Sequence, residues 1–154
     1  MNRTPGRHLA ALVALVFVTV AAAADAPTVT NAWSRATAPG VDVGAAYMTI
    51  EGGPKDDRLV AASTARAAMV HLHTVEESGG VAKMRPVEGI DVPAGRKVEL
   101  APKGMHLMLM GLSSPLVAGE SYALTLTFAN AGDVTVQAKV RASGEDDRAG
   151  QTQH

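Results

Sequence analysis

The sequence contains no cysteine. Without cysteine the chain can form no disulfide and no metal site with thiolate ligands, which excludes the type 1 blue-copper centre and cysteine-based zinc sites. Any sulfur ligand must therefore come from one of the seven methionines. An excess of charge is also lacking, because 14 Lys and Arg residues stand against 15 Asp and Glu residues with no long run of either sign. A nucleic-acid partner is not expected, since binding to phosphates needs a basic surface.

One apolar run stands near the amino terminus, from Leu9 to Val20. Two arginines precede it and four alanines follow it at 21–24, which is the three-part layout of a secretory signal peptide. The run is shorter than the roughly 20 apolar residues that a membrane-spanning helix needs. We therefore predict a cleaved signal peptide over 1–24 and an exported chain without a stable membrane span. A retained membrane anchor is the alternative.

Short segments of alternating apolar residues fill the rest of the chain, separated by Gly, Pro and Asp. This pattern is typical of an all-β sandwich or barrel, and the length fits a single domain with one core. The predicted strands lie near 28–36, 44–51, 58–64, 68–75, 81–87, 96–100, 105–111, 121–129 and 133–141. We predict one β-domain over 25–141 and a disordered polar tail over 142–154.

Four soft or borderline metal ligands stand within these strands, namely His73, Met84, His106 and Met108. Thioether sulfur is a poor ligand for hard cations and a good one for Cu(I), so a His/Met set indicates copper. Cu(I) accepts low coordination numbers, and three or four neutral donors would leave the site with a net positive charge. The sequence therefore indicates a Cu(I) site.

Strand alternation places most of these donors away from the predicted core, because side chains two residues apart share a face. The aliphatic faces are Ala68, Val70 and Leu72 in one segment and Met105, Leu107 and Leu109 in the other. The opposite faces hold Met69, His71 and His73, and His106, Met108 and Met110. A hydrophobic core alone would not require this arrangement. Met84 is expected in the hairpin that turns at Gly79-Gly80.

Each donor also has a simpler interpretation. A single strand methionine is most often a flexible core residue, and a single strand histidine is usually a surface group. Met48 and Met105 are assigned to the core, and Trp33 and Tyr47 to core or edge packing. Four further residues are left open as assisting ligands: Met69, His71, Met110 and His154.

The spacing of the four donors resembles the signature of the PCuAC family of periplasmic copper chaperones. His73 is followed by ten residues and Met84, and then by twenty-one residues and His106-Leu107-Met108. The flanking sequence is also similar, from about Trp33 to Val140. The resemblance implies a cupredoxin-like Greek-key β-sandwich or barrel in which these four residues bind Cu(I) at an exposed site.

The resemblance also implies a location in the periplasm and delivery of copper for assembly of the cytochrome c oxidase copper centres. The expected partner is a copper-accepting protein, such as a cytochrome c oxidase subunit or another copper chaperone. Two positions differ from many relatives, which have an acidic residue at Thr74 and a methionine at Ala82. A second, weaker Cu(II) site is left open by His71 beside His73, although the tail offers only His154.

Three other functions remain as alternatives. A copper storage or resistance protein would use the same residues and would differ only in whether it releases the ion. An enzyme or electron carrier is not expected, because cysteine is absent, no G-x-S-x-G or phosphate-loop motif occurs, and no general acid or base stands near the donors. A metal-free assembly module would keep its function without His73 and Met108.

Overall fold

The structure is a computed structural model that describes residues 25–144. The predicted signal peptide and most of the predicted tail, including His154, lie outside the described residues. Within the described residues there are ten strands and no helix: β1 Thr28–Arg35, β2 Val43–Glu51, β3 Asp57–Ser63, β4 Ala67–Ser78, β5 Val81–Pro86, β6 Ile90–Val92, β7 Lys97–Leu100, β8 His106–Leu112, β9 Ser121–Phe128 and β10 Gly132–Arg141. None of these residues forms a helix long and apolar enough to cross a membrane. The all-β prediction is confirmed.

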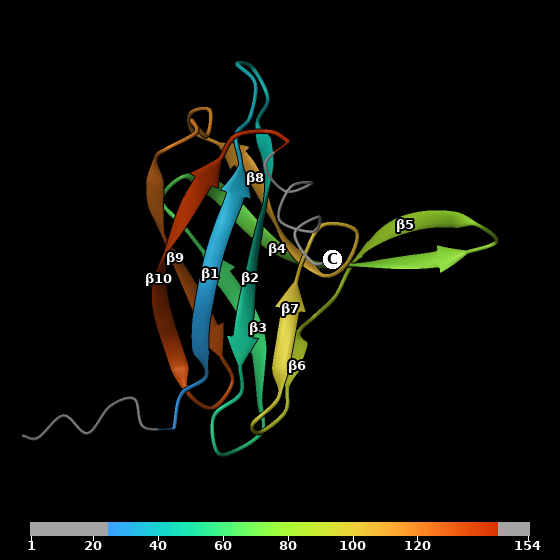
Figure 1. The fold of residues 1–154 in the computed structure, drawn as a ribbon, viewed down its shortest axis with the longest axis vertical. Coiled ribbons are helices and arrows are strands. Elements are labelled where there is room, and N and C mark those ends of the chain that lie inside the picture. Colours follow the sequence, from blue (N-terminus) through green and yellow to red (C-terminus); the bar gives the residue numbers. More distant parts are fainter. Residues whose placement is uncertain (1–24, 145–154) are drawn as a thin grey trace, which may run out of the picture.

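All ten strands belong to one sheet, in the order β5-β4-β8-β2-β1-β10-β9-β3-β6, with β7 also paired to β2. The pairing is antiparallel throughout except between β1 and β10, which run parallel. The sheet curls so that β3 lies against β4, although they stand far apart in the strand order. The strands thereby enclose a single core (Figure 1).

The core contains the predicted aliphatic faces except for Ala68, which is exposed near the start of β4. Leu72 of β4 and Leu107 and Leu109 of β8 are buried, and they join residues such as Leu124 and Phe128 of β9. Complete burial of one such side chain contributes roughly 1.5–3 kcal/mol. Because these residues fix the inward face of β4 and β8, the residues between them must point outward.

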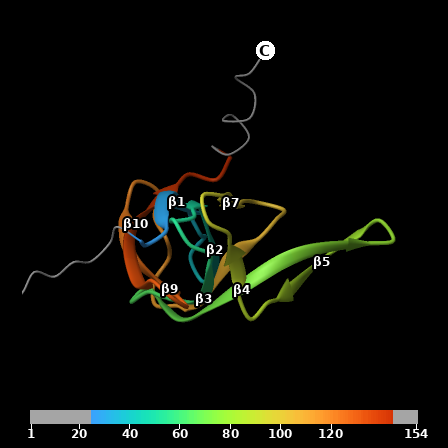
Figure 2. The same cartoon turned by 90° about the horizontal axis from the view of Figure 1, so that it is seen from below.

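Two features of the strands differ from the prediction. β6 is missed, because a three-residue strand is too short to show alternation. β4 continues to Ser78 instead of ending near residue 75, and with β5 it projects from the body as a two-stranded arm (Figures 1 and 2). Gly79 and Gly80 form its turn with φ of 61° and 77°, a conformation that glycine adopts without strain. An ion pair between Arg85 and Glu76, 2.5 Å apart, joins the two strands of the arm.

Candidate metal centre

The outward faces of β4 and β8 bring the soft donors together in cross-strand pairs. In the register of these two strands, His73 lies opposite His106, His71 opposite Met108, and Met69 opposite Met110. Directly opposed residues of an antiparallel pair have Cβ atoms about 4.5–5.5 Å apart, and their side chains point to the same side. The predicted orientation of these six residues is confirmed, and the register adds which ones are neighbours.

His106 is the most deeply placed of the four predicted ligands, with only 4% of its surface exposed. Its ring lies 6.4 Å from the ring of Tyr47, which in turn packs at 4.7 Å against Trp33. Its Nδ1 donates a hydrogen bond of 2.9 Å to the carbonyl oxygen of Gly104. A carbonyl oxygen can only accept, so the proton is on Nδ1 and the lone pair of Nε2 is free for a metal ion.

His73 lies beside this ring, with the two ring centroids 5.6 Å apart. Its Nδ1 is buried and has no hydrogen-bond partner among the described residues. Burial lowers the pKa of His73, and positive charge on His106 and on His71 would lower it further. The ring is thus held in the neutral form that a metal ion requires. A buried nitrogen without a partner is energetically costly, and a bound metal ion would relieve that cost.

Met84 approaches from the arm. It lies opposite Val75, and therefore on the same side of β4 as His73 two residues away. A hollow of about 630 Å³ separates the arm from the body, and Met84, His106 and Met108 all line it. Met84 is 63% exposed, whereas Met108 is half-buried. The expectation of an exposed site therefore holds for Met84 but not for His106, whose buried ring lies near Tyr47 and is bonded to Gly104.

The structure thus places all four predicted ligands, two imidazoles and two thioethers, around one region. Residues 25–144 contain no group of three or more His, Asp or Glu side chains placed to hold one metal ion. A thioether has no proton to lose, and an imidazole binds a metal ion in its neutral form, so a metal ion bound here would have only uncharged ligands. Such a set matches Cu(I) and offers little to hard cations, which prefer carboxylate and carbonyl oxygens.

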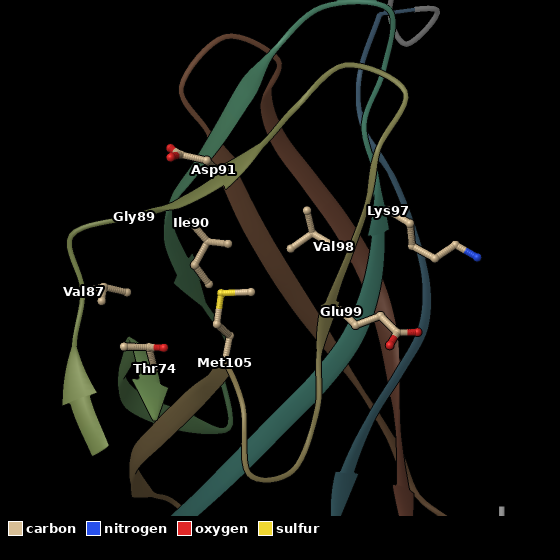
Figure 3. Close-up of a pocket in the computed structure, with 9 residues that line it drawn as sticks. All are labelled: Thr74, Val87, Gly89, Ile90, Asp91, Lys97, Val98, Glu99 and Met105. Carbon is tan, nitrogen blue, oxygen red and sulfur yellow. The ribbon is translucent and has the colours of Figure 1, made fainter. Parts of the chain in front are cut away.

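The remaining histidines and methionines take other places. His71 lies one row further along β4, with its ring centroid 6.2 Å from that of His73, and Met69 and Met110 lie one row beyond it. Met48 is buried in the core and Met105 is packed against it, as predicted. Met105 faces a different hollow of about 520 Å³ on the other side of β4 and β8, which Thr74 also lines (Figure 3). None of the four predicted ligands lines that hollow.

Sequence reasoning missed several residues around the donors. Arg35, Tyr47, Glu77 and Lys103 line the hollow with Met84 and His106. Tyr47 is buried, as predicted, but its role beside His106 depends on the pairing of β2 with β8. No local pattern in the sequence reveals that pairing.

Comparisons with known proteins identify relatives of the chain in sequence and in structure. A sequence model of the family described as putative lipoprotein LpqE-like matches residues 27–140. A putative lipoprotein of Leifsonia xyli subsp. xyli is 34% identical over 120 residues, which cover 77% of this chain and 71% of the relative.

Solved structures with the same fold include copper-loaded forms. The copper-bound PCuAC domain from PmoF2 is 27% identical with a TM-score of 0.65, and the match covers 75% of this chain and 92% of that domain. Apo-DR1885 from Deinococcus radiodurans is 33% identical with a TM-score of 0.62, over 94% of this chain and 97% of the other. The Cu(I) form of DR1885 is 32% identical with a TM-score of 0.62, over 84% and 86% of the two chains. These matches confirm the prediction of a cupredoxin-like β fold.

Proposed function

The chain belongs to the LpqE-like (PCuAC) family, and from this membership we propose that it is a copper chaperone. In this proposal Cu(I) binds to His73, Met84, His106 and Met108 and is passed on to an acceptor protein. The main support is the pairing of His73, which has a buried and unpartnered Nδ1, with His106, whose ring lines one hollow together with Met84 and Met108. The copper-bound structures of PmoF2 and DR1885 support the choice of metal.

The four donors differ in exposure, and this difference provides a direction for release. Met84 is 63% exposed on the arm, whereas His106 is buried and its ring is fixed by the bond to Gly104. An incoming ligand reaches the ion from the side of Met84 and can replace that thioether first. The two imidazoles still hold the ion at that stage, so copper is never free in solution. The copper remains Cu(I) throughout, and the role is transfer without a chemical reaction.

We propose the periplasm as the place of this transfer. The leader pattern at 1–24 and the lipoprotein names of the relatives support an exported protein. The proposed acceptor is a copper-receiving protein, such as a cytochrome c oxidase subunit or another copper chaperone. The alternative to be tested is that the protein stores copper and does not pass it to an acceptor.

An anaerobic Cu(I) titration against a chromogenic chelator tests the donor set. The protein should be expressed at full length and purified after export, together with a Met84→Leu/Met108→Leu variant. Leucine keeps the volume of methionine, so the fold should be preserved while both thioethers are lost. Met105→Leu is the matched control, because this methionine faces the hollow on the opposite side of the sheet. We expect the wild type and the control to bind a first equivalent tightly and the double variant to lose it. Equal binding by all three would show that the donor set is wrong.

A second experiment separates transfer from storage. Copper-loaded protein is mixed with increasing concentrations of the apo copper domain of an oxidase subunit, and the rate of copper arrival is followed. A chaperone passes the ion through a complex, so the rate should rise with acceptor concentration. A rate that equals the slow dissociation of copper at every acceptor concentration would favour storage.

A further inference from the structure

A second group of soft donors lies on the outward face of β4 and β8, further from the arm than the four proposed ligands. Met69 and Met110 are directly opposed across the two strands. Met69 is 55% exposed and Met110 is half-buried. Two thioethers whose Cβ atoms are about 4.5–5.5 Å apart can reach a common ion between the strands.

Ordinary packing does not account for this pair. Methionine is usually a core residue, and leaving more than half of its side chain in water forfeits the benefit of burial. On the other side of Met110 lies Val43 of β2, which is also exposed. This row of the sheet therefore presents an apolar surface with two sulfur atoms and no charged group. Such surroundings attract no hard cation and leave the thioethers as the available donors.

A third donor stands in the next row. His71 is exposed, lies two residues from Met69 on the same face of β4, and is opposite Met108. Residues two apart along a strand are separated by roughly 6.6 Å, within which a long methionine side chain and an imidazole can converge. Met69, Met110 and His71 together supply the three neutral donors that Cu(I) accepts.

We propose that Met69, Met110 and His71 form a second Cu(I)-binding position on this face. The inference goes beyond the proposed function, because none of these residues belongs to the four proposed ligands. Met69 and His71 are exposed, whereas His106 is buried and His73 is half-buried, so the ion is held less tightly at the second position.

The second position lies along the same ladder as the first. Each row of the ladder supplies at least one soft donor: Met69 with Met110, His71 with Met108, and His73 with His106. The rings of His71 and His73 are 6.2 Å apart, so an ion at the outer position is one ligand exchange away from the inner one. The outer position can therefore take up a second ion or receive one on its way to the first.

The test is Cu(I) stoichiometry combined with methyl NMR of methionine-labelled protein, using the full-length chain purified after export. The wild type should bind two equivalents, and the methyl signals of Met69 and Met110 should shift mainly with the second. Met69→Leu/Met110→Leu should lose the second equivalent and keep the first. Met84→Leu/Met108→Leu should lose the tight first equivalent and leave the shifts of Met69 and Met110 in place. His154→Ala should bind two equivalents as the wild type does, which would exclude His154 as a ligand of the second ion.

Two results would overturn the second position. One is a wild type that binds a single equivalent with no shift at Met69 or Met110. The other is a second equivalent that survives in Met69→Leu/Met110→Leu, because the ion would then be bound elsewhere. Either result contradicts the second position and does not affect the proposal of the four-ligand site. Unchanged tight binding in Met84→Leu/Met108→Leu would contradict the four-ligand site and would not affect the second position.

Discussion

Replacing Tyr122 by Phe should destabilise the protein by an amount that the structure allows us to estimate. The hydroxyl of Tyr122 in β9 forms a hydrogen bond of 2.5 Å with the hydroxyl of Ser34 in β1. Both residues are buried, and Ser34 is completely so. Tyr122→Phe keeps the ring in place but leaves the Ser34 hydroxyl without this partner, which costs about 1–3 kcal/mol.

The size of the bond can be isolated with a double-mutant cycle. For the 120 described residues the entropy of unfolding is about 0.25 kcal/mol per degree, so each kcal/mol lowers Tm by about 4 °C. Tyr122→Phe should therefore lower Tm by about 4–12 °C, and Ser34→Ala by a similar amount. The double variant should lose less than the sum, because no buried hydroxyl is left without its partner. Calorimetry and urea unfolding measure all four proteins. Additive losses, or single losses below about 0.5 kcal/mol, would refute the argument.

The same residue gives this prediction a dependence on pH. Burial raises the pKa of Tyr122, although the bond with Ser34 and the charge of Arg66 act in the opposite direction. The unfolded chain therefore loses this proton first, at a pH of about 10. The contribution of Tyr122 to the free energy of unfolding is fully present below that pH, and it is lost as the pH rises through the pKa of Tyr122 in the folded protein. Tyr122→Phe should remove this part of the alkaline decline in urea unfolding curves.

Three further predictions concern the arm, the contact between Gly111 and Ala68, and acid stability. Met84→Leu should leave the melting temperature of the apoprotein almost unchanged, because the side chain is 63% exposed, but it should remove most of the rise caused by Cu(I). That rise corresponds to about 2.7 kcal/mol when free Cu(I) is 100 times Kd, and an undiminished rise would exclude Met84 as a ligand. Gly111→Ala should cost about 1–3 kcal/mol in urea unfolding, since Gly111 has φ of 66° and a Cβ there would lie 2.9 Å from the Cβ of Ala68. At Asp57 burial alone would raise the pKa, but bonds from three backbone N–H groups together lower it. The free energy of unfolding should therefore decrease as the pH falls through the pKa of Asp57 in the folded protein, and Asp57→Asn should make this decrease smaller in urea unfolding curves. An unchanged decrease would contradict the role given to Asp57.

The orientation of the donors was predictable because it depends only on local alternation. Leu107 and Leu109 fix the inward face of β8, so His106 and Met108 must face outward whatever the strand pairs with. Gly79-Gly80 likewise marks a turn, and a hairpin after His73 brings Met84 back alongside β4. These inferences need only the two-residue period of a strand and the conformational freedom of glycine.

The environment of each donor was not predictable in the same way. The burial of His106 results from Tyr47, which belongs to β2 and reaches β8 only through long-range pairing. The register that sets Met69 opposite Met110 is equally non-local. The projection of the arm from the body is also invisible in the sequence, since β5 has the composition of an ordinary strand although every residue in it is exposed.

The two departures from the usual family pattern have unequal consequences for the donor set. Thr74 lines the hollow on the opposite side of the sheet together with Met105 (Figure 3), so its side chain faces away from the proposed ligands. Ala82 lines the hollow of the proposed ligands and lies opposite Glu77 on the arm, two residues from Met84. A methionine there would add a second thioether on the arm, whereas alanine leaves Met84 as the arm's one sulfur donor within the described residues. Closure of the proposed copper site therefore depends on the position of a single side chain on an exposed two-stranded arm, which is also where an acceptor would make its first contact.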